Sequence, residues 1–312
     1  MAREGTETRL MSRIHEALKK AAQEKTSQLS GRERPDRAPV AVAISETVMP
    51  VSQPTERAPR GTWAPPAGTL FRFEDLVKRC ARPEWKPDPR LSLFHQGNNA
   101  KLGAERFRTL RSRLYQIAAT KPLRKVLVTS SLPSEGKTFV ATNLAHSIVS
   151  QADRRVLLID SDLRVPRLHT ELGAPSSPGL ADYLRGEVDE FTVIQQGPQI
   201  NLCFIPCGRI VSNPSELLSG DRMKNLLDTV APIFDWVILD SSPAVPVHDA
   251  SILADLCDGV LFVVKAGETS HETAVKACSE FRGKNLLGVV LNQIEPGQSY
   301  EGHYSGYLGE EE

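Results

Sequence analysis

The chain has 312 residues, with 38 lysines and arginines against 38 aspartates and glutamates, so its formal net charge is zero. This balance excludes a strongly basic nucleic-acid-binding protein and a protein with a dominant acidic tail. Hydrophobic residues make up 40% of the chain, which is enough to build a full core. No run of about 18 apolar residues is present, so we expect no membrane-spanning helix, and residues 1–10 are too charged for a secretory signal.

The cysteines are widely spaced and contain no CxxC pair or zinc-type His/Cys cluster. We therefore expect reduced, mostly buried thiols rather than a disulfide framework or a structural metal. The five cysteines are Cys80, Cys203, Cys207, Cys257 and Cys278.

The first 97 residues divide into two stretches. Apolar residues between Leu10 and Ala22 recur at helical spacing, which predicts a short amphipathic helix within residues 1–29. Residues 30–97 are rich in proline, glycine, serine and arginine, which predicts a largely disordered linker. Only Leu70–Cys80 within it favours a turn or two of helix.

Residues 98–294 have the pattern of a globular domain, opening with a helical stripe from Phe107 to Ile117. Strands are predicted at Lys125–Thr129, Val156–Asp160, Leu202–Ile205, Trp236–Asp240, Val260–Val264 and Leu287–Leu291. Helices are predicted at Lys137–Ser150, Ser215–Val230, Ala250–Leu256 and His271–Phe281. Near-continuous apolar strands alternating with helices predict an α/β fold: a doubly wound, mostly parallel sheet with helices on both faces.

The segment Val126–Thr138 reads VLVTSSLPSEGKT and places a phosphate-binding loop between a strand and a helix, as in P-loop NTPases. In such loops, backbone amides at the helix start wrap the phosphates, Lys137 neutralises their charge and the Thr138 hydroxyl ligates Mg²⁺. Ser131 replaces the first glycine of the usual GxxxxGK[ST] pattern. The candidate nucleotide-binding residues are Ser131, Pro133, Ser134, Glu135, Gly136, Lys137, Thr138 and Phe139.

Carboxylates follow two further predicted strands. Asp160 and Asp162 end the strand Val156–Asp160, and Asp240 ends the strand Trp236–Asp240. Because the carboxyl ends of parallel strands meet at one edge, we expect these side chains to face the phosphates and their metal. The alternative for each aspartate alone is an ordinary turn residue at the end of a strand.

Three features together resemble the bacterial tyrosine kinases (BY-kinases) of capsular and exopolysaccharide synthesis. They are the loop containing Pro133 and Glu135-Gly-Lys-Thr138, the sequence Asp160-x-Asp162-x-Arg164, and Asp240 with Pro243. Further matches are Gly179–Gly186, Asn213–Leu218, Asp258–Val264 and Gly288–Asn292, so the resemblance covers about residues 98–312.

This resemblance implies an ATP-dependent protein-tyrosine autokinase. It assigns Lys137, Asp160 and Asp162 to catalysis, with Thr138, Asp160 and Asp240 around Mg²⁺, and it makes Asn292 a candidate contact for adenine. Two other functions stay open: an ATPase switch of the deviant P-loop group, and a nucleotide-dependent assembly adaptor without catalysis. The deviant ATPases carry a signature lysine near the start of the loop, where this chain has Leu132.

Two charged or polar segments fit the same resemblance. Tyr300, Tyr304 and Tyr307 lie in a glycine- and glutamate-rich tail, residues 295–312, which we expect to be flexible and to supply the phosphoacceptors. Glu105, Arg108 and Arg111 recur every three residues on a predicted helix and match the family's ExxRxxR pattern, which is linked to ring-shaped self-association.

The resemblance also implies partners and a location. We expect a ring-like homo-oligomer, activation by the cytoplasmic tail of a membrane polysaccharide co-polymerase, reversal by a tyrosine phosphatase, and no nucleic-acid partner. The expected location is the cytoplasm, at the inner face of the plasma membrane through that partner.

Overall fold

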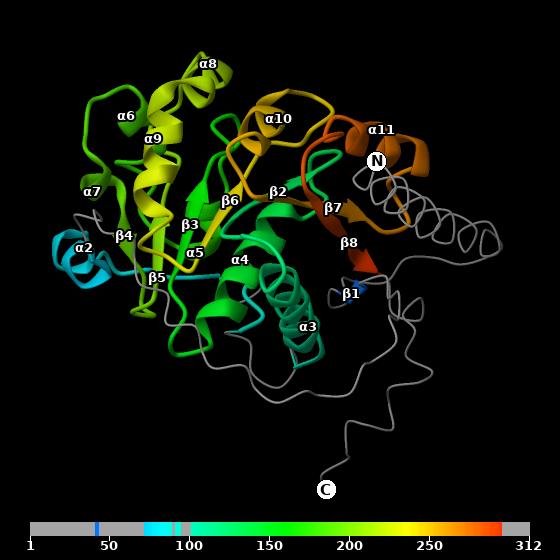
Figure 1. The fold of residues 1–312 in the computed structure, drawn as a ribbon, viewed down its shortest axis with the longest axis horizontal. Helices are drawn as coiled ribbons and strands as arrows, with labels where there is room; N and C mark the ends of the chain where they lie inside the picture. Colours follow the sequence, from blue (N-terminus) through cyan, green and yellow to red (C-terminus); the bar gives the residue numbers. More distant parts are fainter. Residues whose placement is uncertain (1–40, 44–71, 89–90, 95–100, 295–312) are drawn as a thin grey trace, which may run out of the picture.

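The structure, a computed structural model, describes residues 41–43, 72–88, 91–94 and 101–294. The helix predicted within residues 1–29 and the tyrosine-rich tail lie outside the described residues. The strands are β1 (Ala41–Ala43), β2 (Lys125–Ser130), β3 (Val156–Asp160), β4 (Gln195–Gln196), β5 (Leu202–Ile205), β6 (Trp236–Asp240), β7 (Gly259–Lys265) and β8 (Leu286–Ile294). They form one eight-stranded sheet in the order β1-β8-β7-β2-β6-β3-β5-β4 (Figure 1).

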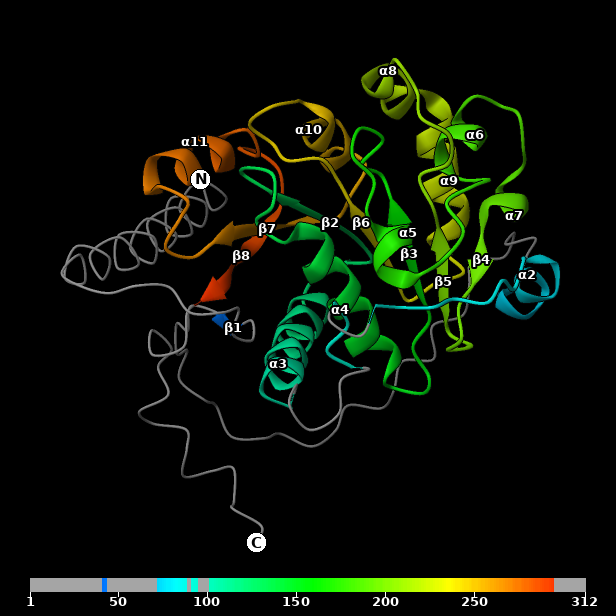
Figure 2. The ribbon, with the colours of Figure 1, turned by 180° about the vertical axis from the view of Figure 1, so that it is seen from behind.

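The predicted doubly wound α/β fold is confirmed. Strands β2, β3, β5, β6, β7 and β8 run parallel, and β1 and β4 pair antiparallel at the two edges. Five residues of β3 and five of β6 are all buried, because helices cover both faces of the sheet. Figures 1 and 2 show the helices on either side of the strands.

The helices are α2 (Phe73–Arg79), α3 (Lys101–Ala118), α4 (Lys137–Val149), α5 (Leu168–Leu172), α6 (Leu180–Leu184), α7 (Glu190–Val193), α8 (Pro214–Ser219), α9 (Asp221–Val230), α10 (Asp249–Ala254) and α11 (His271–Ser279). Alternate strand residues point to opposite faces. Val126 and Val128 pack with α3, α4 and α5, whereas Leu127 packs into the core beneath α2, α6 and α9–α11.

The structure differs from the sequence prediction at several short elements. The single helix predicted at Ser215–Val230 is two helices, α8 and α9, because Gly220 between them has extended backbone and glycine is a poor helix former. Helices α5, α6 and α7 and strand β4 were not predicted, since five residues or fewer are too short to show a period.

Within residues 30–97, predicted as a largely disordered linker, the described residues are ordered, and Ala41–Ala43 forms strand β1. Residues 72–88 and 91–94, here called the N-terminal arm, pack on the domain through buried side chains that include Phe73 and Leu76. Trp85 packs edge-on against Phe204 of β5 at a centroid distance of 5.8 Å. The sequence did not predict that the arm is ordered, because its few apolar residues are spread among prolines and charged residues and show no helical or strand period. The turn of helix favoured within Leu70–Cys80 is confirmed as α2.

Candidate functional site

The P-loop joins β2 to α4 and is shaped by two residues with positive φ, Ser134 at 66° and Gly136 at 91°. A Cβ on Gly136 would lie 1.9 Å from the Asn292 side-chain nitrogen, so glycine is required by both conformation and space. Helix α4 starts directly at Lys137. Its first backbone amides therefore lie at the loop, as phosphate binding needs.

Two of the predicted nucleotide-binding residues also brace the loop. The buried Glu135 carboxylate accepts hydrogen bonds from the Leu132 amide at 2.7 Å and from the Thr269 hydroxyl. The Asn292 carboxamide, two residues before the end of β8, donates to the Glu135 carbonyl at 2.9 Å. Asn292 thus contacts the P-loop in this structure, and its contact with adenine stays a prediction.

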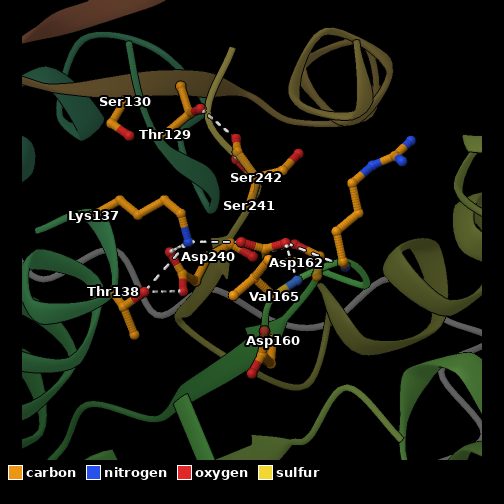
Figure 3. A network of polar contacts seen from close by, with 12 residues as sticks. Thr129, Ser130, Lys137, Thr138, Asp160, Asp162, Val165, Asp240, Ser241 and Ser242 are labelled. Atoms are coloured by element: carbon orange, nitrogen blue, oxygen red, sulfur yellow. Dashed lines mark hydrogen bonds and ion pairs between the residues drawn. The ribbon is translucent and has the colours of Figure 1, made fainter. Parts of the chain in front are cut away.

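Lys137 and the predicted aspartates meet at the carboxyl edge of the sheet. The Lys137 ammonium lies 2.9 Å from an Asp162 oxygen and 3.6 Å from an Asp240 oxygen. The Thr138 hydroxyl donates to the other Asp240 oxygen at 2.7 Å. Asp160 and Asp240 are register partners on adjacent strands. Figure 3 shows this network, which is hereafter called the acidic cluster.

Burial sets the electrostatics of the acidic cluster. It raises the pKa of Asp160 well above its usual value, and the neighbouring Asp240 charge raises it further. Burial also raises the pKa of Asp240 to about 6, although Lys137 partly opposes the shift. For Lys137, burial disfavours the ammonium, but Asp240 and Asp162 outweigh it and raise its pKa. Three buried carboxylates thus share one ammonium.

The residues present fit a nucleotide with Mg²⁺. Asp160 Oδ1 and Asp240 Oδ1 are buried and accept no hydrogen bond from the described residues, although Lys137 lies near the latter. Carboxylate and hydroxyl oxygens are the ligands that Mg²⁺ prefers, and the excess negative charge favours a divalent cation. Thr138, Asp160 and Asp240 would hold the ion, while Lys137 and the α4 amides would bind phosphate oxygens.

A second polar network holds the loop after β3. The Arg164 guanidinium binds both Asp249 carboxylate oxygens, at 2.6 and 3.1 Å. The Ser215 hydroxyl donates to Asp249 at 2.6 Å, and Asp249 itself is buried. The backbone amides of Arg164 and Val165 bind Asp162 Oδ1 at 3.3 and 3.0 Å, which leaves Oδ2 for Lys137.

Sequence reasoning missed two acidic residues near the site. Asp249 lies at the start of α10 and had no strand-end signal, although its partners belong to motifs that were recognised. Glu171 on α5 accepts a hydrogen bond from the Thr142 hydroxyl at 3.0 Å. Burial, followed by the charge of Asp240, raises the pKa of Glu171 to about 7. No local pattern marks a buried acid on a five-residue helix.

The predicted oligomerisation residues do not act alike in this structure. Glu105 and Arg108 form an exposed ion pair with 2.7 Å between their charged atoms. Arg111 instead donates to the Ser147 carbonyl on α4. Tyr300, Tyr304 and Tyr307 lie outside the described residues. None of the helices in the described part of the chain is long and apolar enough to cross a membrane.

The fold and the site define a P-loop nucleotide-binding domain. The family model described as the CobQ/CobB/MinD/ParA nucleotide binding domain matches residues 126–311, more than half of the chain. The chain is 34% identical over 207 residues to the tyrosine-protein kinase YwqD of Bacillus subtilis, a match covering 66% of this chain and 87% of that protein.

Solved kinase domains have the same fold. The kinase domain of the Escherichia coli tyrosine kinase ETK superposes with a TM-score of 0.63 at 30% identity, covering 70% of this chain and 87% of that domain. The chimerical protein CapA2B2 gives a TM-score of 0.62 at 28% identity, covering 72% of this chain and all of that one. This chain therefore belongs to the bacterial tyrosine kinase family.

Relatives differ in length. The tyrosine-protein kinase etk of Escherichia coli K12 is 32% identical over 228 residues, which cover 72% of this chain but only 31% of that protein. The putative tyrosine-protein kinase AmsA of Erwinia amylovora is 34% identical, with 30% of its length covered. The chain thus matches most of one relative and about a third of the others.

Proposed function

We propose that this chain is an ATP-dependent protein-tyrosine kinase that phosphorylates its own tail tyrosines between copies and so regulates exopolysaccharide or capsule polymerisation and export. The observation that carries the proposal is the acidic cluster beside a P-loop, in a chain whose relatives are named tyrosine-protein kinases. The activity, the substrates and the partners are all part of this proposal.

The proposed reaction transfers the terminal phosphoryl group of ATP to a tyrosine hydroxyl. Bound Mg²⁺ supplies charge neutralisation of the phosphates. Lys137 leaves Asp162 and binds phosphate oxygens, while the α4 amides orient them. Asp160, beside the metal, is the group assigned to activate the incoming tyrosine hydroxyl and to take up its proton. Asp162, released from Lys137, supports the metal and its water shell.

Assembly and location follow from the same proposal. Glu105, Arg108 and Arg111 would form contacts between copies in a ring, with Arg108 exchanging its present intramolecular partner for one on the neighbour. The chain would act in the cytoplasm at the inner membrane face, where the tail of a membrane co-polymerase activates it and a tyrosine phosphatase reverses its labelling.

The test is phosphotyrosine formation by the purified full chain with Mg-ATP, with and without the tail of the candidate membrane partner. We expect labelling in wild type, none in Asp160→Asn, and full labelling in the matched control Asp153→Asn, which alters an exposed carboxylate before β3. ATP turnover without phosphotyrosine would instead support the ATPase switch, and binding without turnover would support the adaptor.

Self-association is tested separately. Replacing both Glu105 and Arg108 by alanine should shift the mass measured by light scattering toward the monomer. The double variant lacks both exposed charges that are proposed to pair with the neighbouring copy. The control is Lys78→Ala on α2, which removes a similarly exposed member of an i,i+3 pair. An unchanged mass in the double variant would contradict the proposed role of this helix.

A further inference from the structure

Helix α5 contacts both the acidic cluster and α4, the helix that follows the P-loop. Its first residue, Leu168, donates its backbone amide to Asp160 Oδ2 at 3.1 Å. Its fourth residue, Glu171, accepts a hydrogen bond from the Thr142 hydroxyl of α4 at 3.0 Å. Figure 2 shows α5 beside α4. One short helix therefore joins an aspartate of the cluster to the helix that carries the phosphate-binding residues.

The Leu168 amide determines how the Asp160 carboxylate is turned. Asp160 is fully buried. Within the described part of the chain its Oδ2 accepts the bond from Leu168, whereas its Oδ1 accepts none. Because hydrogen bonds are directional, a carboxylate with one anchored oxygen presents the other oxygen in a direction that the anchor sets. A rotation of α5 would therefore turn the oxygen that Asp160 presents to the site.

Two kinds of contact hold α5 against α4. The leucines at the two ends of α5 are buried and pack in the same apolar cluster as Val140 and Leu144 of α4. Apolar packing is non-directional, so by itself it leaves the rotation of a helix of little more than one turn loosely determined. The hydrogen bond from Thr142 to Glu171 is directional. We infer that this bond sets the rotation of α5.

Thr142 lies on the same face of α4 as a residue of the acidic cluster. It follows Thr138 by four residues within the helix, and residues at that spacing are neighbours on a helix surface. The Thr138 hydroxyl donates to Asp240 Oδ2 at 2.7 Å. The bond to Glu171 therefore meets α4 one turn away from the cluster, and its loss has only a short, packed path to act on the site.

The C-terminal end of α5 is also bound by the N-terminal arm. The Glu171 carbonyl accepts a hydrogen bond from the Asp88 amide at 3.2 Å, and the Gly173 carbonyl accepts one from the Lys86 amide at 3.0 Å. These bonds involve backbone atoms only, so they do not depend on the side chain at position 171. A change of the Glu171 side chain therefore tests the rotation of α5 and leaves the helix attached to the protein.

We propose that Glu171 and Thr142 are positioning residues for phosphoryl transfer, because they hold α5 in the rotation that directs Asp160 at the acceptor hydroxyl. Both residues act through the Leu168 amide and touch neither the nucleotide nor the acceptor. This inference rests on the proposed function, in which Asp160 activates the incoming hydroxyl. It gives a role to an acidic residue that the sequence motifs do not mark.

The experiment measures the maximal rate of phosphotyrosine formation and the KM for ATP in the full-length chain at pH 8. Glu171→Ala and Thr142→Val each remove the hydrogen bond, whereas Glu171→Gln keeps its acceptor and Thr142→Ser keeps its donor. The matched control is Asp189→Ala, which removes a bond of 2.8 Å from the Thr192 hydroxyl to a carboxylate at the start of α7.

We expect Glu171→Ala and Thr142→Val each to lower the maximal rate about tenfold, with the KM for ATP unchanged. The double variant should lose no more than either single variant, because both changes remove the same bond. Glu171→Gln and Thr142→Ser should restore most of the rate, and Asp189→Ala should equal wild type. Losses that add in the double variant, an equal loss in Asp189→Ala, or a raised KM for ATP would each overturn the assignment.

The glutamine variant separates positioning from charge. Glu171 is mostly ionised at pH 8, since burial and the charge of Asp240 raise its pKa to about 7. Glutamine keeps the acceptor oxygen and removes this charge. A maximal rate for Glu171→Gln as low as that for Glu171→Ala would therefore assign the effect to the charge and contradict the positioning role.

A second measurement needs no turnover. Hydrogen exchange of the backbone amides in the peptide that spans α5 should become faster in nucleotide-free Glu171→Ala and keep the wild-type rate in Glu171→Gln, because the Leu168 amide loses its fixed acceptor when α5 rotates. Unchanged exchange in Glu171→Ala would refute the route through α5. If wild type forms no phosphotyrosine while exchange changes as expected, the proposed function fails and the coupling of Glu171 to Asp160 through α5 is upheld.

Discussion

Replacing Lys137 by methionine should destabilise the nucleotide-free protein in a pH-dependent way. The ammonium is buried and lies within 4 Å of two carboxylates, which themselves are almost wholly buried. Methionine has similar length but leaves Asp160, Asp162 and Asp240 without a cation. Removing one partner of a buried ion pair typically costs about 3 kcal/mol or more, since the remaining charge is uncompensated.

The pH dependence follows from the raised carboxyl pKa values. The pKa of Asp240 is about 6 in the folded protein against a lower value when unfolded, so the folded state holds more protons between these values. Stability therefore falls as pH rises through this window, and loss of Lys137 raises the folded pKa values further and steepens the fall. We expect a loss of about 3 kcal/mol at pH 8 and about 1 kcal/mol at pH 5.

The assay is urea unfolding of both proteins without nucleotide at the two pH values. The control is Lys125→Met. The Lys125 ammonium lies 3.8 Å from a carboxylate oxygen of Asp228, which is exposed. Losing this pair should lower the free energy of unfolding by less than ~1 kcal/mol at either pH. Equal losses for Lys137→Met at pH 5 and pH 8 would refute the view that the cluster carboxylates drive the effect.

Three other variants test neighbouring features. Asp249→Asn should reduce the rate of phosphotyrosine formation about tenfold. Because Asp249 acts through the loop that carries Asp162, the same change should cause no further loss in an Asp162→Asn variant. Losses that add in the double variant would contradict this route. The stability of Glu171→Gln relative to wild type should rise by on the order of 2 kcal/mol between pH 5 and pH 8.5. The reason is that wild type must ionise a buried carboxyl over this range, whereas the variant has none. Calorimetric melting of both proteins at the two pH values measures the difference. Gly136→Ala should weaken Mg-ADP binding in a titration and cost about 2 kcal/mol in urea unfolding, whereas Gly267→Ala, with similar positive φ and open space, should cost less and leave binding intact.

The sequence was most informative where local pattern and tertiary role coincide. The bounds of β3 and β6 were predicted to the residue, because each is a continuous apolar run closed by an aspartate. The same runs placed Asp160 and Asp240 at one edge of a parallel sheet, and their register pairing confirms that placement.

What the sequence did not reveal depends on contacts between distant segments. Glu135 fits the loop motif, but its bracing of the loop depends on Thr269, which lies 134 residues further along the chain. Asp249 becomes part of the site only when α10 meets the loop after β3. The raised pKa of Glu171 comes from burial, and a five-residue helix is too short for its sequence pattern to predict which side chains are buried.

The N-terminal arm determines where the independently folding unit begins. Residues 72–80 cover an apolar surface near α7 and α9, and Ala81 forms a bridge with Gln195 of the edge strand β4. A protein shortened to start at residue 98 would uncover Phe204, against which Trp85 packs, and would leave β4 open to pairing with another chain. Poor solubility or a less cooperative unfolding transition in such a protein would result from the uncovered edge of the sheet and not from a defect in the P-loop core. Truncated forms should therefore retain the chain from residue 72 onward.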